Sequence, residues 1–417
     1  MTTDADVIVV GAGLAGLTAA AAARQAGRRV LVVEAHLPGG RARTVEREGF
    51  TLNMGAHALY RNGAGTKVLA ALGITPEGAA PPLAHYRALA GGTLHVLPTG
   101  PASLLRTGVV GARSKAQLVG LLGRLPRLRV EALARTTVAE WLQGCHLRPD
   151  AESVVRALLR LSTYSDDVET FSAGAALGQL QLATNGGVLY LHRGWSQLSD
   201  GLSRSLTVRA GVDVQGLDHR GDRVEVRTSG GTLVAPRVVV ATGGPAAVRR
   251  ILPTEPDWGE LGPPVTAACL DLGLSREPDP GYVLSLDDPV YATMQSPPAH
   301  QTLGHGAVMA TIRYGARNAT ADRSQLEGLA QVAGVDDRNV VVRRFLAHMT
   351  VCGALPVASA GGLAGRPDIE DTGVPGITMA GDWVGPVGLL ADASLASGYR
   401  AGRQAGRDRP GSTKMVA

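Results

Sequence analysis

Aromatic, cysteine and lysine side chains are scarce in this sequence. Phe, Trp and Tyr make up 4% of its 417 residues, and its three cysteines, Cys145, Cys269 and Cys352, lie far apart with no C-x-x-C pair. This pattern indicates neither a disulfide framework nor a zinc site, and it favours a reducing, cytoplasmic setting. A hydrophobic fraction of 45% with 55 glycines is typical of a globular α/β protein, and the length favours two domains.

Segments with the character of a membrane span are also lacking. Residues 7–23 carry no charge, but Asp4 and Asp6 stand where a secretion signal needs basic residues, and three glycines interrupt the run. The later uncharged stretch 171–191 contains Gln, Thr and Asn side chains and a Gly-Gly pair. We therefore expect neither stretch to be a targeting signal or a membrane span.

The strongest positive pattern is residues 6–35, DVIVVGAGLAGLTAAAAARQAGRRVLVVEA. Val7–Val10 is an apolar, β-branched run that predicts a buried strand of a parallel sheet, and an alanine-rich helix and a second apolar strand, Val30–Val33, follow it. The turn between strand and helix has the G-x-G-x-x-G pattern, made by Gly11, Ala12, Gly13, Leu14, Ala15 and Gly16. Together these elements predict a dinucleotide site in a Rossmann-like α/β domain.

Each part of this unit has a physical role at a pyrophosphate. Gly11 allows the tight turn, Gly13 lets the backbone approach the phosphates, and Gly16 lets the helix pack closely on the strand. The helix N-terminus offers unpaired N–H groups and a partial positive charge. Glu34 and Ala35 end the second strand, where a carboxylate can accept both ribose hydroxyls and would repel a 2′-phosphate. This unit alone leaves NAD and FAD both open.

Three later segments favour FAD. The turn Gly39, Gly40, Arg41 and Ala42 follows the second strand, so its backbone can face the pyrophosphate while the Arg41 guanidinium donates to phosphate oxygens. Gly381 and Asp382 end an apolar run and place a carboxylate where it can accept a hydrogen bond from a polyol; FAD has a ribityl chain, whereas NAD has no polyol. The third segment is the start of a helix at Leu389 and Leu390, whose dipole can stabilise negative charge on a flavin edge.

On these motifs the chain resembles the FAD-dependent superfamily of flavin amine oxidases, protoporphyrinogen oxidases and phytoene or squalene-associated desaturases. The resemblance implies a discontinuous Rossmann-like FAD-binding domain with an inserted α+β substrate domain. It also implies that the glycine-rich turn, Glu34, the Gly39–Arg41 turn and the Gly381-Asp382 pair all serve FAD. By position it assigns further residues to the cofactor: Val214 at the adenine, and Met54, Gly55 and Ala56 at the flavin.

The chain departs from the family pattern at two places. Asn53 stands where the family usually has an acid before the third-strand glycine, which puts any role for a charge there in doubt. Family members that bind their flavin covalently carry a cysteine near the flavin-facing segments. This sequence has none close to Gly381 and Asp382; Cys352, the nearest, lies well upstream along the chain. We therefore predict non-covalent FAD.

The alternation of strand and helix patterns is interrupted twice, which predicts two domains built from separated segments. We assign residues 1–80, 186–261 and 347–417 to the FAD-binding domain. The segments 81–185 and 262–346 then form the substrate domain.

Residues 81–135 are strongly basic, with eight cationic side chains against Glu131 alone. The cations are Arg87, Arg106, Arg113, Lys115, Arg124, Arg127, Arg129 and Arg135. A stripe of leucines at 118, 121, 122 and 125 accompanies them, so the region is a candidate for peripheral membrane contact or an ordinary amphipathic helix packed on its own domain. It lacks the aromatic interleaving of nucleic-acid sites, and we expect no nucleic-acid partner.

The predicted reaction is hydride removal from a largely apolar, isoprenoid-like substrate, with formation of a double bond. A flavin amine oxidase is the first rival, although the three lysines, Lys67, Lys115 and Lys414, avoid the second inserted segment, where amine oxidases carry a water-holding lysine. A redox-neutral FAD isomerase or scaffold is the second rival.

His57 is a candidate proton shuttle or a structural side chain. No second G-x-G-x-x-G occurs, which argues against an NAD(P)H site.

Overall fold

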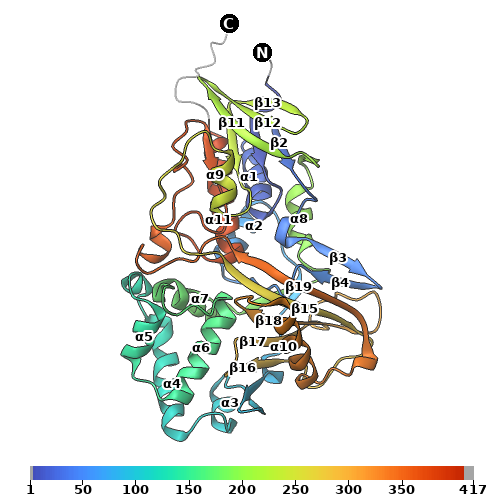
Figure 1. Cartoon of the computed structure of the whole chain (residues 1–417), viewed down its shortest axis with the longest axis vertical. Coiled ribbons are helices and arrows are strands. Elements are labelled where there is room, and N and C mark those ends of the chain that lie inside the picture. Colours follow the sequence, from blue (N-terminus) through green and yellow to red (C-terminus); the bar gives the residue numbers. More distant parts are fainter. Residues whose placement is uncertain (1–2, 408–417) are drawn as a thin grey trace.

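The computed structural model describes residues 3–407 and shows two domains stacked along the long axis of the molecule (Figure 1). A five-stranded parallel sheet in the order β10-β2-β1-β14-β20 centres the upper domain. Its strands are β1 (Val7–Val10), β2 (Val30–Glu34), β10 (Thr207–Ala210), β14 (Arg237–Val240) and β20 (Ile377–Met379). They come from three separated parts of the chain. The valine runs of the central strands β1, β2 and β14 are largely buried, as expected for strands covered on both faces, whereas the edge strand β10 is mostly exposed.

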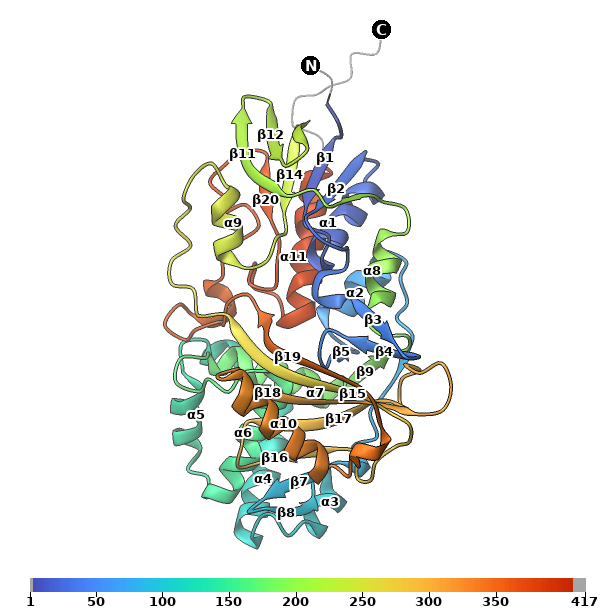
Figure 2. The same ribbon diagram turned by 45° about the vertical axis from the view of Figure 1, so that its right-hand side comes forward.

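Two long helices, α1 (Leu14–Gln25) and α11 (Leu390–Ala405), lie side by side in this domain (Figure 2). Their approach depends on glycine: a Cβ at Gly398 would overlap the carbonyl of Ala15, and a Cβ at Gly402 would overlap that of Ala19. This close contact sets the second half of α11 against the first turns of α1. The carboxyl ends of the strands and the starts of both helices line one cavity at the edge of the sheet, where open α/β sheets bind ligands.

Smaller elements complete the upper domain. The helices are α2 (Ala64–Ala71), α8 (Ser196–Ser203) and α9 (Pro245–Ile251). An antiparallel sheet at the top contains β11 (Val214–Arg220), β12 (Arg223–Thr228) and β13 (Gly231–Ala235). The short strands are β3 (Thr44–Arg47), β4 (Phe50–Asn53), β5 (Leu59–Tyr60), β6 (Gly78–Ala79) and β9 (Val188–Leu191).

A seven-stranded sheet in the order β19-β15-β18-β17-β16-β7-β8 forms the lower domain. Its strands are β7 (Arg87–Ala90), β8 (Thr93–Val96), β15 (Val265–Leu274), β16 (Val283–Ser285), β17 (Val290–Ser296), β18 (Ala307–Tyr314) and β19 (Val340–Cys352). Its helices are α3 (Pro101–Arg106), α4 (Ala112–Arg124), α5 (Val138–Cys145), α6 (Pro149–Thr163), α7 (Ala173–Gly186) and α10 (Ala319–Val332). One apolar core joins the sheet to these helices.

The predicted fold class, a Rossmann-like FAD-binding domain with an inserted α+β substrate domain, is confirmed by this architecture. One predicted boundary differs, because β19 continues to Cys352 beyond the expected start of the third FAD-binding segment at residue 347. Its antiparallel ladder with β15 extends from Leu274↔Val340 to Val265↔Cys352, with three register shifts along it, so backbone pairing keeps these residues in the substrate sheet. The strand thereby carries the substrate domain up to the nucleotide domain.

The leucine stripe of residues 81–135 packs inward. Leu118 and Leu125 are buried, and Leu121 and Leu122 pack against the substrate-domain core, so this stripe is not available to a membrane. Within residues 3–407, no helix combines the length and hydrophobicity needed to cross a bilayer.

Candidate functional site

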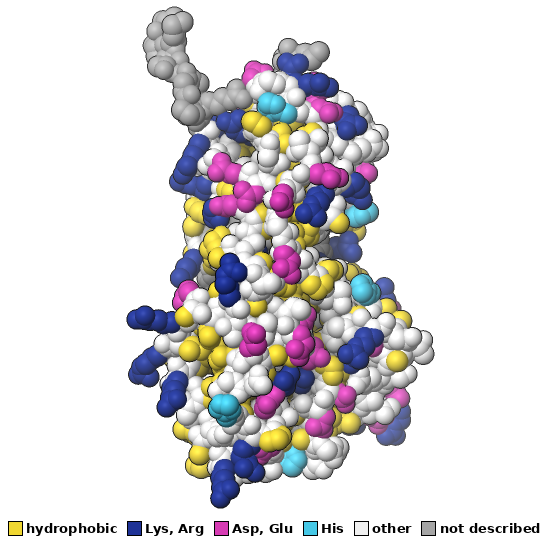
Figure 3. All heavy atoms as spheres, turned by 60° about the vertical axis from the view of Figure 1, so that its left-hand side comes forward, with side chains coloured by type: hydrophobic (Ala, Val, Ile, Leu, Met, Phe, Trp, Pro, Cys, Tyr) yellow, Lys and Arg dark blue, Asp and Glu magenta, His cyan; other side chains and the backbone are white. Residues whose placement is uncertain are grey.

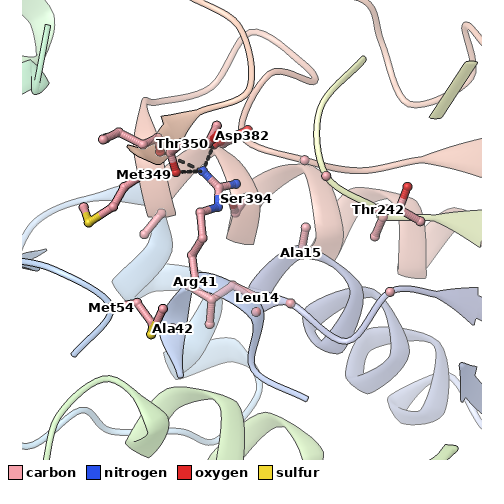
Figure 4. Close-up of a pocket in the computed structure, with 18 of the residues that line it drawn as sticks. Leu14, Ala15, Arg41, Ala42, Met54, Thr242, Met349, Thr350, Asp382 and Ser394 are labelled. Atoms are coloured by element: carbon pink, nitrogen blue, oxygen red, sulfur yellow. Dashed lines mark hydrogen bonds and ion pairs between the residues drawn. The ribbon is translucent and has the colours of Figure 1, made fainter. Parts of the chain in front are cut away.

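A cavity of about 810 Å³ lies where the carboxyl edge of the parallel sheet meets β19. Its walls come from the ends of β1, β2, β14 and β20, from the starts of α1 and α11, and from residues 345–351 of β19. Figure 4 shows Arg41 extending across this space toward Asp382 and Thr350, with Thr242 on the opposite side. Most strand-end and loop residues that the sequence singled out therefore surround one space.

The glycine-rich turn has the shape that the sequence predicts. Gly11 has a φ of 103°, and a Cβ there would lie 2.5 Å from the carbonyl oxygen of Ala241, so the β1 turn requires glycine. A Cβ at Gly16 would overlap the carbonyl of Gly11, which sets the close packing of α1 on the turn. Gly13 lines the cavity, and a Cβ there would meet no atom within 4 Å. Gly13 thus leaves an open cradle at the N-terminus of α1.

Glu34 lies at the end of β2 with its carboxylate fixed by two backbone donors. The N–H of Ala12 donates to Oε2 at 2.7 Å, and the N–H of His36 donates to Oε1 at 2.9 Å. Asp213 and Val214 line the same part of the cavity. The remaining lone pairs of Glu34 can accept ribose hydroxyls, the role predicted for this residue.

Arg41 and Asp382 form an ion pair across the cavity (Figure 4). Nη1 of Arg41 lies 2.7 Å from Oδ2 of Asp382 and also donates to the carbonyl of Val351 at 2.7 Å. Oδ1 of Asp382 accepts the N–H of Gly353 at 3.1 Å. The Asp382 side chain is 1% exposed, whereas that of Arg41 is 45% exposed, and the carboxylate raises the pKa of Arg41. Among residues 3–407, Nε and Nη2 of Arg41 have no partner, so both remain available to a phosphate.

His57 lies on the cavity wall immediately after the segment Met54–Ala56. Its Nδ1 is 2.8 Å from the carbonyl oxygen of Gly55, so Nδ1 carries the proton, and its ring packs on Trp195 with centroids 4.9 Å apart. Burial lowers the pKa of His57 to about 4, an effect that the hydrogen bond to Gly55 offsets only in part. The imidazole is therefore neutral at pH 7 and does not act there as a cationic acid.

The neutral Asn53 has a structural role that accounts for the missing acid. Its Oδ1 accepts the backbone N–H of Trp195 at 2.9 Å, which holds the indole against His57. Behind this strand, buried Arg344 pairs with Asp271, with Nε 3.0 Å from Oδ2, and also donates to the carbonyl of Asn53. The cavity wall at Met54 is thus supported by a buried ion pair on β19 and β15.

The start of α11 adds an unusual backbone and a buried acid. Leu390, the first helical residue, has a φ of 56°, a conformation that costs a non-glycine residue about 1–3 kcal/mol. Asp392 in the first turn is 2% exposed, and its Oδ1 accepts the N–H of Gly65 at 2.7 Å while its buried Oδ2 has no partner in the described structure. Burial raises the pKa of Asp392 to about 6.

Comparison with known proteins identifies the family. The family model for flavin containing amine oxidoreductases matches residues 14–274. The chain belongs to this family. As a member it is an oxidoreductase, and FAD is its cofactor.

Similar curated proteins and solved structures show how far the similarity extends. A hydroxyneurosporene desaturase of Rhodobacter capsulatus is 42% identical over 78 residues, which are 18% of this chain and 16% of that protein. A phytoene dehydrogenase of Streptomyces griseus is 56% identical over 54 residues, 13% of this chain and 11% of that protein. A redesigned putrescine oxidase has a TM-score of 0.72 at 17% identity, covering 97% of this chain and 99% of the other. An oxidoreductase from Methanosarcina mazei gives 0.73 at 15% identity, covering 94% and 99%.

The donor set of the cavity fits FAD. Open space over Gly13 and the free guanidinium nitrogens of Arg41 match a pyrophosphate, and Glu34 matches a ribose. The buried, unpartnered Oδ2 of Asp392 offers one further acceptor in the wall. These residues would hold the cofactor, which when bound supplies a two-electron hydride acceptor.

The structure places the predicted cofactor residues in two groups. A first group lines the cavity: Gly11, Gly13, Leu14, Ala15, Glu34, Ala35, Gly40, Arg41, Ala42, Met54, Ala56, Val214, Gly381, Asp382 and Leu390. A second group supports it from behind: Ala12, Gly16, Gly39, Gly55 and Leu389. Two contacts show how: Gly39 donates its N–H to the carbonyl of Ala12, and Leu389 is buried in the core. A Cβ at Gly55 would lie 2.5 Å from the Met349 side chain, so this glycine admits β19.

Sequence reasoning missed the wall contributed by β19 and the acid of α11. Residues 345–351 and Asp392 line the cavity, as do Tyr60 and Tyr164. β19 carries no motif, since its alternating pattern resembles any other sheet strand. Asp392 could have been found from the sequence. It is a single acid among alanines and glycines at the start of the helix that was predicted to face the flavin.

Proposed function

We propose that this FAD-dependent oxidoreductase removes a hydride from a C–H bond of a largely apolar substrate, such as an isoprenoid, and so forms a double bond. One observation supports this most: apolar side chains of β19, of residues 54–59 and of the segments at Trp195 and Leu390 line the cavity. They are Met54, Ala56, Leu59, Trp195, Phe345, Leu346, Met349 and Leu390. Such a wall binds hydrocarbon through burial of apolar area and excludes water from the reacting bond.

The roles of the chain in this reaction are binding and orientation. When bound, FAD would supply the acceptor for the hydride with its electron pair, and the proton lost from the neighbouring carbon would pass to bulk solvent. Neutral His57 and the protonated Tyr60 and Tyr164, whose pKa values burial raises, carry no charge that would repel a hydrocarbon. The locally similar desaturase and phytoene dehydrogenase are named for reactions of this class, which supports the proposal without extending beyond the short aligned stretches.

Amine oxidation is the second candidate because of Asp392. A buried carboxylate with an unpartnered oxygen beside the cavity is a possible counter-ion for an ammonium group. Against this candidate, none of the residues that line the cavity in the described structure is a lysine.

The test mixes FAD-loaded protein anaerobically with a panel of polyene precursors and amines. We expect a polyene precursor to bleach the blue flavin absorption and to lose two hydrogens by mass spectrometry. Bleaching by amines alone, with hydrogen peroxide formed after oxygen is admitted, would select the amine oxidase. If neither class bleached the flavin, the proposal would fail and a redox-neutral role would gain support.

A matched pair of variants on β19 sharpens this test. Leu346 faces the cavity, whereas Val341 on the same strand is 51% exposed. Leu346→Asp places a charge in the apolar wall, so kcat/KM for the hydrocarbon should fall by about tenfold or more. Val341→Asp should leave it unchanged. Equal effects of the two variants would contradict an apolar substrate site.

A further inference from the structure

Helix α4 presents a second apolar face, opposite its leucine stripe. Positions 112, 116, 119, 120 and 123 share one side of a helix with 3.6 residues per turn, and all five are exposed. They are Ala112, Ala116, Val119, Gly120 and Gly123. The outer face of α4 therefore has no polar side chain along about 20 Å of helix.

Cationic side chains border this outer face. Arg113 and Arg124 flank it on one side and Lys115 on the other, while Arg127 and Arg129 follow the helix C-terminus. All four arginines are exposed, and none forms an ion pair with a residue of 3–407. The nearby acid Asp150 is already engaged, because its carboxylate accepts from the N–H of Gly111 and the hydroxyl of Ser114. The four arginines are thus available to an external anion.

Leu105 extends the apolar face beyond the helix. Lys115 Nζ donates to the carbonyl of Leu105 at 2.9 Å, which holds the end of α3 beside α4. Leu105 is 78% exposed and Val119 60%, both among the largest exposures of apolar side chains in the described chain. Figure 3 shows that cationic side chains stand at the edge and tip of the lower domain, whereas acidic ones gather nearer the middle.

We propose that the outer face of α4 docks the protein on an anionic lipid surface. Small apolar residues bordered by cations suit the boundary between headgroups and acyl chains, where arginines bind phosphates and Leu105 and Val119 enter the acyl layer. A nucleic acid fits less well, because the face offers no aromatic or amide side chain to a base. This inference is independent of the proposed reaction.

The test measures sedimentation of the FAD-loaded full chain with vesicles. One set contains phosphatidylcholine alone, and in the other a third of the lipid is phosphatidylglycerol. We expect binding to the anionic set only, weakened by added salt. No binding to anionic vesicles, or equal binding to both sets, would overturn the proposal.

Charge-reversal variants locate the surface. R113E/R124E/R127E should weaken vesicle binding by about tenfold or more. The matched control R24E/R204E/R209E, three exposed arginines of the other domain, makes the same change in net charge and should bind within about twofold of the natural chain. Unchanged FAD content and circular dichroism verify folding. Similar losses in both variants would attribute binding to net charge and overturn the assignment to α4.

The apolar contact has its own variant and competitor. L105S/V119S should lose the part of the binding that survives high salt, and full retention of that part would contradict insertion of these side chains. Duplex DNA should not displace the protein from vesicles at equal phosphate concentration. Displacement that depends on the same arginines would instead make α4 a general polyanion site.

Discussion

At the scale of single residues, Arg41 is the side chain on which the cavity most depends. Its guanidinium joins the turn after β2 to the carboxylate at the end of β20, and its Nε and Nη2, which have no partner within residues 3–407, remain available to a phosphate in the cavity. The sequence predicted both residues for the cofactor. Their mutual pairing could not be predicted, because it depends on the side-by-side placement of segments far apart in the chain.

Replacement of Arg41 should destabilise the protein through Asp382. Arg41→Ala leaves a buried carboxylate without its cation, so the free energy of unfolding should fall by about 1–3 kcal/mol. In the double variant R41A/D382N the free energy of unfolding should fall by less than the sum of the two single-variant losses, because the amide needs no counter-charge. Urea unfolding of the FAD-free protein measures these free energies. Strictly additive losses would contradict an energetically important pair.

Asp392 should make stability depend on pH in a direction opposite to that of an ordinary salt-bridged acid. The folded carboxyl holds its proton to about pH 6, whereas the unfolded one releases it near pH 3.8. The folded state therefore binds more protons between these values, and the free energy of unfolding falls as pH rises through this window.

Asp392→Asn should remove this dependence. The stability of the variant relative to the natural protein should improve by about 1–3 kcal/mol between pH 4 and pH 7, measured by urea unfolding. The exposed Asp200→Asn variant is the control and should show no such trend. A constant difference between the D392N and natural proteins across this range would show that Asp392 titrates normally.

At the scale of elements, different glycines of the glycine-rich turn serve cofactor binding and folding. A Cβ at Gly13 enters open cavity, whereas one at Gly16 overlaps the backbone of Gly11. Gly13→Ala should change the free energy of unfolding by no more than about 1 kcal/mol. It should weaken FAD binding by about tenfold or more, as measured by the quenching of flavin fluorescence on binding. Gly16→Ala should destabilise the FAD-free protein strongly. The reverse pattern would contradict the assigned roles.

Elements with a repeating pattern were predictable, and elements defined by long-range packing were not. The composition of the valine-rich strands β1 and β14 and of the alanine-rich helix α1 is enough to predict both their secondary structure and their burial. Helix α4 has apolar residues on both faces, so periodicity alone could not tell which face meets the core. β19 extends from the substrate sheet to the cofactor cavity, and its pairing with β15 contains bulges. No local sequence pattern predicts these bulges.

At the scale of the whole molecule, two domains share one cavity. The nucleotide domain supplies Gly13, Glu34 and Arg41, and the substrate domain supplies the β19 wall and Tyr164. The fold class, family and cofactor followed from short motifs at the strand ends. The substrate side had no motif, because the hydrocarbon that we propose as substrate would be recognised by the shape of an apolar wall, and many side-chain combinations can make one.

An absorption spectrum of the purified, FAD-reconstituted protein, recorded before and after heat denaturation, tests the central claim most directly. We predict flavin bands in the near-ultraviolet and blue that stay with the folded protein and pass into the supernatant when heat precipitates the chain. Flavin that remains attached to the precipitate would contradict non-covalent binding. A chain that stays colourless after incubation with FAD would contradict the assignment of the cavity to this cofactor.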